Sequence, residues 1–259
     1  MVQRLTDFIW IGNDTIFNEP SILRTARILY AFGRNMRNLG GYYRSLSLNI
    51  QQPHTLLERF FPPINTFCGS DGVTVKFKYI KYLELDPLCT TFLAVTEAPV
   101  SKNIVVKFVH RYNDVAHTLL ADNDMAPNLL FYGKLSSVRD TYPSCDGLNM
   151  VVMDYIDGLT ADIAHMRKLL PPDFLDQVRR ILALLHHHNY VFGDLRGPNI
   201  MVTKDNKVMF IDFDWVGKDG ESHYPIIMAQ TIDWPEGVKD GLGVMLKEHD
   251  THMLLRLLP

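Results

Sequence analysis

A chain of 259 residues is long enough for one large domain or two small ones. Hydrophobic residues make up 47% of the sequence and charged residues 21%, which is typical of a globular protein with a real core. The net charge of −3 offers no overall attraction to nucleic acid or to an anionic membrane, so we expect neither as a partner.

The cysteines and the N-terminus bear on the compartment. Cys68, Cys89 and Cys145 are widely spaced and odd in number, which argues against a disulfide framework or a zinc site. The first residues have no apolar signal core, and no apolar run approaches the ~18 residues that a membrane span needs. We therefore expect an intracellular protein, cytoplasmic or nuclear, without membrane contact.

The first predicted element is a helix over residues 21–39, where apolar residues recur at a spacing near 3.6. Ser21 is placed to cap its start, and Gly40 and Gly41 are expected to end it. Several arginines form a basic stripe along this helix, and such a stripe is more often a solvated face than a nucleic-acid surface.

A second short helix is predicted at 54–60, and Pro62 and Pro63 would end it. We interpret residues 1–68 together as an N-terminal helical extension that is packed on, or linked to, the rest of the chain.

Beyond residue 73 the hydrophobic period changes to two, as in half-buried strands. The predicted elements are strands at 73–79, 91–96 and 104–109, a helix at about 113–121, and strands at 129–132 and 148–153. Lys107 lies in the third of these strands, where the ordinary explanation is an edge-strand lysine.

Residues 172–187 show the clearest helical pattern, with one continuous apolar face. Asn189 is placed to end this helix in a left-handed cap. The three histidines 186–188 at its end point in different directions, so a favourable interaction with the helix dipole explains them better than a shared metal. Residues 238–257 are predicted to form one amphipathic helix.

The stretch Phe-Gly-Asp-Leu-Arg-Gly-Pro-Asn at residues 192–199 carries the candidate chemistry. It places Asp194, Arg196 and Asn199 in one loop, and two short apolar strands then lead to Asp212 and Asp214. Because only two short strands separate these acids, they can face one cleft. The simpler alternative is a turn whose Asp and Asn residues are ordinary caps.

Phosphoryl transfer is the chemistry that uses this set of side chains. A carboxylate orients or deprotonates the attacking hydroxyl, while an amide oxygen and a second carboxylate hold magnesium on the nucleotide phosphates. A fixed cation offsets the charge that develops in the transition state.

The ordered motifs resemble the protein-kinase-like superfamily, whose signatures are H-R-D-L-x-x-x-N and D-F-G. This chain has F-G-D-L-R-G-P-N and D-F-D in their place. The Gly-Asp pair and the second acid resemble the choline and aminoglycoside kinase branch. Overall the chain is most similar to a kinase-like domain of fungal proteins, over roughly residues 73–250 by motif order.

This resemblance implies an α+β, two-lobed protein-kinase-like fold with a small antiparallel N-lobe sheet and a reduced helical C-lobe. Residues 69–158 would form the N-lobe and hinge, and residues 159–259 the reduced C-lobe. The residues after Asp214 are too few for a full C-lobe, so we expect either a reduced C-lobe or a fragment of a longer chain. In both cases the usual peptide-docking surface would be largely missing.

The resemblance also implies roles for individual residues. Asp194 would be the catalytic base or orienter, Arg196 the cation near the transferred phosphate, and Lys107 the contact to the other phosphates. The implied magnesium ligands are Asn199, Asp212 and Asp214.

Residues 151–158 resemble a kinase hinge. Met153 would border the adenine pocket, and the backbones of Asp154 and Ile156 would hydrogen-bond the base. A buried strand that runs into a glycine turn explains the same residues.

The chain departs from the kinase pattern at three places. The loop 83–90 between the first strands contains no glycine, although kinase loops use glycine to approach phosphate. The helix at 113–121 has Asp114 and no Glu to pair with Lys107. The segment Asp233-Trp234-Pro235-Glu236-Gly237 only partly matches the D-x-W-x-x-G anchor of kinases.

These observations predict an ATP-dependent phosphotransferase that uses Mg²⁺ and acts on a hydroxyl of a protein or a small molecule. The alternative is a pseudokinase, a nucleotide-binding or non-catalytic interaction module. A third possibility is that the chain is one domain of a larger protein whose other parts supply the acceptor site.

Overall fold

The computed structural model describes residues 19–45, 61–62, 64–83, 90–97, 101–134, 148–229, 231–239 and 241–257. The chain divides into two compact units, Met1–Phe61 and Pro62–Pro259, and each is described by itself.

The first unit contains one described helix, α1 (Glu19–Ser45). The predicted helix is confirmed, but the predicted stop is wrong because α1 continues through Gly40 and Gly41. Glycine inside a helix costs about 1 kcal/mol relative to alanine, which the neighbouring turns can outweigh. The expected helix at 54–60 lies outside the described residues.

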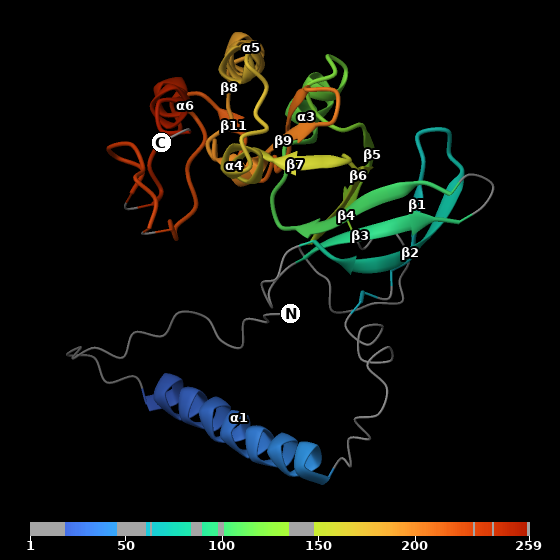
Figure 1. Cartoon of the computed structure of the whole chain (residues 1–259). Helices are drawn as coiled ribbons and strands as arrows, with labels where there is room; N and C mark the ends of the chain where they lie inside the picture. The colour runs from blue at the N-terminus through green and yellow to red at the C-terminus, as the bar shows by residue number, and fades with distance from the viewer. Residues whose placement is uncertain are drawn as a thin grey trace. The chain divides into compact units, whose positions relative to one another are not determined.

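The second unit begins with a six-stranded antiparallel sheet in the order β1-β2-β3-β4-β6-β5 (Figure 1). Its strands are β1 (Thr66–Cys68), β2 (Thr74–Tyr82), β3 (Thr91–Thr96), β4 (Asn103–Val109), β5 (Leu129–Lys134) and β6 (Asn149–Asp154). The five predicted strands are therefore confirmed, with bounds that shift by a few residues.

Strand β1 was not predicted, because three residues are too few to show a period of two. Phe67 pairs with Val75 of β2, so β1 belongs to the sheet. The structure accordingly divides the chain after Phe61, whereas we predicted an extension that ends at residue 68.

Strand β4 lies in the interior of the sheet, paired with β3 on one side and β6 on the other. Lys107 faces Thr91 across one pairing and Val151 across the other. The edge-strand explanation of Lys107 is therefore wrong. Only 8% of this residue is exposed, which demands a charged partner nearby.

Helix α3 (Asp114–Ala121) connects β4 to β5 and confirms the predicted helix there. Asn113 caps its N-terminus, because the Asn113 side chain accepts a hydrogen bond from the Ala116 backbone N–H at 2.9 Å.

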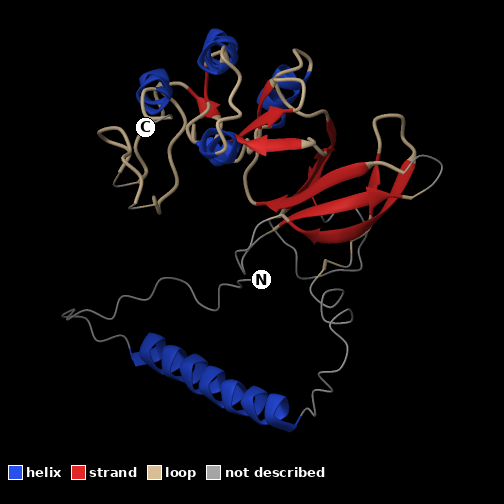
Figure 2. Cartoon of the chain, viewed as in Figure 1, coloured by secondary structure: helices blue, strands red, loops and turns tan. Residues whose placement is uncertain are grey.

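Short strands and helices form the rest of the second unit (Figure 2). They are β7 (Gly158–Thr160), α4 (Ala161–Met166), α5 (Phe174–His187), β8 (Tyr190–Val191), the 3₁₀ turn η2 (Gly197–Asn199), β9 (Ile200–Thr203), β10 (Val208–Phe210), β11 (Gly217–Lys218) and α6 (Lys247–Leu254). Strands β10, β9 and β7 form one small sheet, and β11 pairs with β8. The predicted α+β class, with an antiparallel sheet followed by a reduced helical part, is confirmed.

Helix α5 buries its predicted apolar face, with Val178, Ile181 and Leu185 almost fully covered. Asn189 has a φ of 64°, which confirms the predicted left-handed cap. The helix therefore ends directly before β8 and the loop that carries Asp194.

The predicted single helix over 238–257 is wrong, because α6 is the only helix among the described residues of that range. Gly241 has a φ of 75°, and a Cβ on Gly243 would lie 2.0 Å from the Gly237 carbonyl oxygen. These glycines hold a compact turn that a helix would disrupt.

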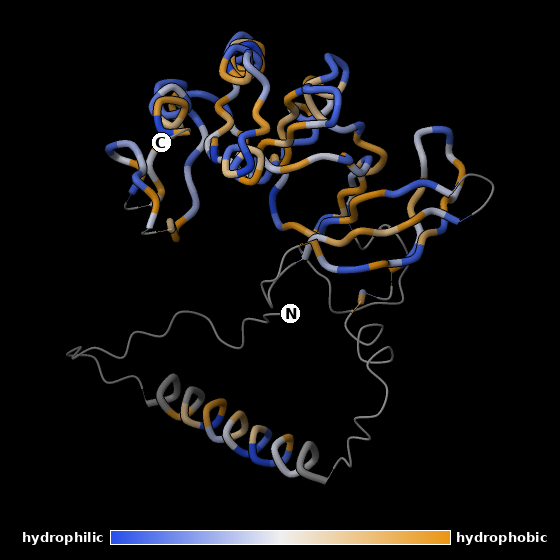
Figure 3. Tube along the Cα trace, viewed as in Figure 1, coloured by the Kyte–Doolittle hydropathy of each residue, from blue (hydrophilic) through white to orange (hydrophobic). Residues whose placement is uncertain are grey.

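Hydrophobic residues are concentrated along the strands and the inward helix faces of the second unit, and α1 shows both hydrophobic and polar stretches (Figure 3). Within the described residues, no helix combines the length and the apolar character that a bilayer crossing would require.

Candidate active site

Lys107 and two acids form the first charge cluster, which we call the acid–lysine cluster. The Lys107 ammonium nitrogen lies 2.8 Å from an oxygen of Asp212 and 2.8 Å from an oxygen of Asp214. The lysine side chain is 10% exposed, whereas those of Asp212 and Asp214 are 36% and 27% exposed. The carboxylates therefore remain open on one side to a cation from solution.

Backbone contacts hold the segment 212–216 against the start of α3. The Asn113 N–H donates to the Phe213 carbonyl at 3.1 Å, and the Asn113 side chain donates to the Val216 carbonyl at 3.2 Å. Asp212 has a φ of 68°, a left-handed conformation that aspartate tolerates better than most residues. This turn brings both acids to the strand that carries Lys107.

His117 of α3 locks the same segment through its ring. The imidazole stacks on the Phe213 ring with centroids 4.4 Å apart and planes 9° from parallel. Nε2 lies 2.7 Å from the Pro127 carbonyl oxygen and Nδ1 lies 2.7 Å from the Tyr112 hydroxyl. A carbonyl can only accept, so Nε2 carries the proton and Nδ1 accepts from Tyr112.

Burial lowers the pKa of His117 to about 4. The neutral ring is therefore the form present near neutral pH. Sequence reasoning missed this residue, because a lone histidine on a helix gives no sign that it will stack on a distant phenylalanine.

The charged groups in the acid–lysine cluster shift one another's pKa values. Burial alone would lower the pKa of Lys107, but the two carboxylates outweigh it and raise the pKa. Burial opposes the ionised form of Asp212 as well, yet the Lys107 ammonium holds its pKa below the usual value. Burial and the Asp212 charge raise the pKa of Asp214 to about 7.

Asp194, Arg196 and Asn199 form a second charge cluster, the loop cluster. The Arg196 guanidinium donates to both Asp194 oxygens, at 2.5 Å from Nε and 2.6 Å from Nη2. The Asn199 amide nitrogen donates to the Asp194 side chain at 2.8 Å and to its backbone carbonyl at 2.9 Å. Asp194 is thus held by both of the residues that the motif placed beside it.

Burial raises the pKa of Asp194 despite the opposing Arg196 charge, and the Asp212 carboxylate contributes to the rise. Burial opposes the charged form of Arg196, yet the hydrogen bond and the charge of Asp194, together with the Asp212 charge, raise the pKa of Arg196. The two clusters are therefore close enough to influence each other electrostatically. The Arg196 guanidinium also lies 6.0 Å from the centre of the Trp234 ring.

Asp250 of α6 anchors the backbone of the loop. Its carboxylate accepts from the Phe192 N–H at 2.8 Å and from the Gly193 N–H at 2.9 Å, and it is 1% exposed. The His186 ring nitrogen Nε2 lies 2.9 Å from the same carboxylate. Sequence reasoning missed Asp250, since nothing near it in the sequence signals this role.

Asp233, which the sequence suggested as a weak match to the kinase anchor, does not make these contacts. Its side chain is 76% exposed and pairs with Arg256 at 2.6 Å. The aspartate of the partial D-x-W-x-x-G match therefore does not hold this loop.

The predicted hinge follows the end of β6. Met153 is 4% exposed and pairs with Val105 of β4. The Asp154 N–H donates to the Asn128 carbonyl at 3.0 Å, so only its carbonyl remains for a ligand. Neither backbone group of Ile156 has a hydrogen-bond partner within the described part of the chain.

The residues that could hold a metal supply only oxygen. Asp212 and Asp214 offer carboxylates, and the Asn199 amide oxygen has no hydrogen-bond partner among the described residues. No group of three or more His, Cys, Asp or Glu side chains in the described segments could enclose an ion alone. This donor set fits Mg²⁺, which proteins commonly bind with one or two carboxylates plus substrate phosphates.

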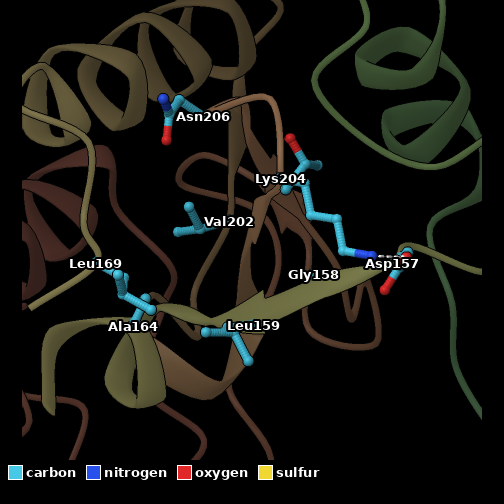
Figure 4. A pocket seen from close by; sticks show the side chains of 9 residues that line it. Asp157, Gly158, Leu159, Ala164, Leu169, Val202, Lys204 and Asn206 are labelled. Atoms are coloured by element: carbon cyan, nitrogen blue, oxygen red, sulfur yellow. Dashed lines mark hydrogen bonds and ion pairs between the residues drawn. The ribbon is translucent and has the colours of Figure 1, made fainter. Parts of the chain in front are cut away.

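A pocket of about 380 Å³ lies beside β7, β9 and α4 (Figure 4). Its apolar lining comes from Leu159, Ala164, Leu169 and Val202. The ion pair between Lys204 and Asp157, 2.5 Å long, borders it. None of its lining residues belongs to the two charge clusters, so it is separate from the candidate site.

Comparisons with known proteins show what this chain resembles. Residues 142–219 match the RIO domain family. A 71-residue stretch is 32% identical to the serine/threonine-protein kinase PknB of Mycolicibacterium smegmatis (strain ATCC 700084 / mc(2)155) and covers 26% of this chain but only 11% of PknB. The structure of the Cydia pomonella Granulovirus kinase, PK-1, is similar with a TM-score of 0.49 and 17% identity, over 69% of this chain and 65% of that one.

The RIO-domain match includes the loop cluster and both acids of the acid–lysine cluster, while Lys107 and α6 lie outside it. Together with the PknB match, it shows similarity to the protein-kinase-like superfamily. The finer resemblances to fungal kinase-like domains and to choline kinases remain predictions.

Proposed function

We propose that this protein is an ATP-dependent phosphotransferase that transfers the γ-phosphate to a hydroxyl of a protein or small-molecule acceptor. One observation carries the proposal. Lys107 contacts two carboxylates that are 105 and more residues away in the sequence, and Asp212 also acts electrostatically on the loop cluster. A lysine, metal-binding acids and a positioned aspartate are the parts that phosphoryl transfer requires.

Lys107 would hold the phosphates that are not transferred. Asp212 and Asn199 would bind Mg²⁺ together with the nucleotide phosphates, and Asp214 is the candidate for a second metal contact. When bound, Mg²⁺ would neutralise charge on the phosphates.

Asp194 fits the role of an orienting carboxylate. Both of its oxygens accept hydrogen bonds from Arg196, and one also accepts from Asn199. These bonds fix its direction, while Oδ1, which accepts only the bond from Arg196 Nε, keeps a lone pair that can accept a substrate hydroxyl. Arg196, whose side chain is 33% exposed, would place its charge beside the transferred phosphate.

The hinge residues would bind adenine through their backbone. The Asp154 carbonyl would accept from the base, because its N–H already donates to Asn128. The backbone of Ile156 would supply the second hydrogen bond, and Met153 would border the pocket.

Metal-dependent stabilisation by ATP tests the proposal. With ATP at 100 times its dissociation constant, the free energy of unfolding should rise by about 2.7 kcal/mol, and only when Mg²⁺ is present. Asp212→Asn should abolish most of the metal-dependent part, whereas Asp233→Asn, which changes an exposed acid, should keep it. A melting temperature that millimolar ATP and Mg²⁺ leave unchanged would count against the proposal.

A specific observation favours the second candidate, a non-catalytic kinase-like module. The described side chains of α3 provide no carboxylate that pairs with Lys107. Nucleotide binding by the wild-type protein without transfer to any acceptor would support this alternative. Turnover that depends on Asp194 would exclude it.

A further inference from the structure

The buried lysine needs a carboxylate partner that stays in place when a metal arrives. Kinases take that partner from the helix after the lysine strand. Here α3 carries a single acid, Asp114, in its first turn, and its buried residues are Ala116, His117 and Leu120. The only polar side chain on that buried face is therefore His117.

His117 cannot serve Lys107 as an acceptor. Its Nε2–H donates to the Pro127 carbonyl, and its Nδ1 accepts from the Tyr112 hydroxyl. Both ring nitrogens are thus occupied, and the ring face lies on Phe213. The helix braces the segment that carries the acids, but it supplies no charge to the lysine.

The two acids that do contact Lys107 are tethered to different parts of the molecule. Asp212 directly follows Ile211, whose N–H donates to the Asn199 carbonyl at 2.9 Å. Asp212 is therefore attached to the loop cluster, beside the other proposed metal ligand.

Asp214 is attached to the side of the lysine strand. The carbonyls of Phe213 and Val216, on both sides of it, accept hydrogen bonds from Asn113. The Trp215 carbonyl accepts from Arg111 at 3.3 Å. Residues 213–216 are thus fixed to the connection between β4 and α3, a few residues beyond Lys107.

We propose that Asp214 is the fixed carboxylate partner of Lys107 and replaces the glutamate that α3 lacks. Asp212 alone exchanges its contact with Lys107 for the metal. This inference rests on the proposed function, because it requires nucleotide phosphates at Lys107 and a metal at Asp212. It differs in one point, since it gives Asp214 a positioning role in place of a second metal contact.

Two affinities separate these roles of Asp214. The first is the affinity for ADP at saturating MgCl₂, measured by calorimetry. The second is the MgCl₂ concentration that gives half of the ADP-induced rise in melting temperature. Removing a partner of Lys107 weakens the first affinity, whereas removing a metal ligand raises the MgCl₂ concentration of the second measurement.

We expect Asp214→Asn to weaken ADP binding about tenfold, the loss of one charge-assisted phosphate contact, and to leave the MgCl₂ midpoint within about twofold. The double variant Lys107→Met with Asp214→Asn should bind ADP no more weakly than Lys107→Met alone. Asp212→Asn should raise the MgCl₂ midpoint at least about tenfold.

Asp114→Asn is the matched control, because it removes the single acid of α3 and should change neither affinity. Asp214→Glu keeps the carboxylate and should recover part of the ADP affinity, which also provides a second variant if Asp214→Asn folds poorly.

The outcomes distinguish this inference from the proposed function. If Asp214→Asn raises the MgCl₂ midpoint as Asp212→Asn does, Asp214 is not the partner of Lys107. The same holds if the losses of ADP affinity caused by Asp214→Asn and by Lys107→Met add fully in the double variant. If the wild-type protein does not bind ADP at any MgCl₂ concentration, the proposed function fails and this inference fails with it.

Discussion

The two charge clusters of the candidate site are built in opposite ways. The loop cluster joins residues that are two to five positions apart in the sequence. The acid–lysine cluster joins Lys107 to Asp212, which lies 105 positions further along. The first cluster depends on the shape of one loop, whereas the second depends on how α3 packs against the segment 212–216.

This difference shows where each cluster can be broken. A change inside the loop should remove chemistry and leave the acid–lysine cluster in place. A change at the anchor of the loop, or at the packing of α3, should instead appear first in stability.

The largest effect is expected from Asp194→Ala. A positioned acid–base group contributes about 10²–10⁴-fold in rate, so turnover should fall by that factor while ATP binding persists. The measurement is phosphoryl transfer, with nucleotide binding and melting recorded on the same sample. Asp205→Ala, an exposed acid in the turn between β9 and β10, serves as the control and should keep full turnover.

The alternative is that Asp194 is an ordinary cap residue of the loop. In that case the variant would lose about 1 kcal/mol of stability and retain its turnover.

The next largest effect is expected from Asp250→Asn. The amide has one acceptor oxygen, and its NH₂ group would face one of the two backbone N–H groups that the carboxylate now satisfies. Losing these charge-assisted bonds in a buried site should cost about 3–5 kcal/mol, visible in chemical unfolding.

Asp233→Asn is the matched control for Asp250→Asn, since Asp233 belongs to the partial D-x-W-x-x-G match but does not contact the loop. Its pair with Arg256 is exposed and screened by solvent, so the loss of stability should be much smaller than that of Asp250→Asn. Equal losses for the two variants would contradict the assignment of Asp250 as the anchor.

Sequence patterns predicted the loop cluster well, because its partners are close in the chain and a motif can show them together. Periodicity also predicted the central strands and α5. Asp250 could not be predicted in this way, because it lies 57 and 58 positions from the N–H groups that it binds. A contact of that kind depends on tertiary packing.

The mistakes have local physical reasons. Gly40 and Gly41 predict a stop, but α1 continues through them. Gly241 and Gly243 lie within the predicted helix over 238–257, but they hold a compact turn. Glycine permits both outcomes, so the surrounding contacts decide.

The stability of the fold should depend on pH through His117, which stacks on Phe213 between the two acids of the acid–lysine cluster. Its pKa is lowered from 6.5 to about 4, so the unfolded chain takes up the proton first as the pH falls. Stability should therefore decrease from about pH 6.5 down to about pH 4, by about 3 kcal/mol in total from this group.

The titration of Asp214 changes the stability in the opposite direction. Its pKa is raised from 3.8 to about 7, so the folded protein binds that proton more tightly and gains stability as the pH falls through this window. His117→Phe isolates the histidine, because the ring is kept and the titration is lost. The stability advantage of the wild type over this variant should shrink towards pH 4, and a constant difference would contradict the role of His117.

The smallest effect is expected from Gly193→Ala, compared with Gly237→Ala. The two glycines have nearly equal φ angles, 81° and 80°, so alanine should cost about 1–2 kcal/mol of backbone strain at either position. At Gly237 a Cβ would meet no atom within 4 Å, but at Gly193 it would lie 2.4 Å from the Cε of Met245.

The comparison of these two variants therefore separates strain from function. The Met245 side chain is flexible, so the extra loss of stability at Gly193 should be small. However, Gly193 directly precedes Asp194, and any shift of its backbone disturbs the N–H that binds Asp250. We expect similar melting temperatures for the two variants, with turnover reduced only in Gly193→Ala. If both variants keep wild-type turnover, the position of Asp194 does not depend on the left-handed turn at Gly193.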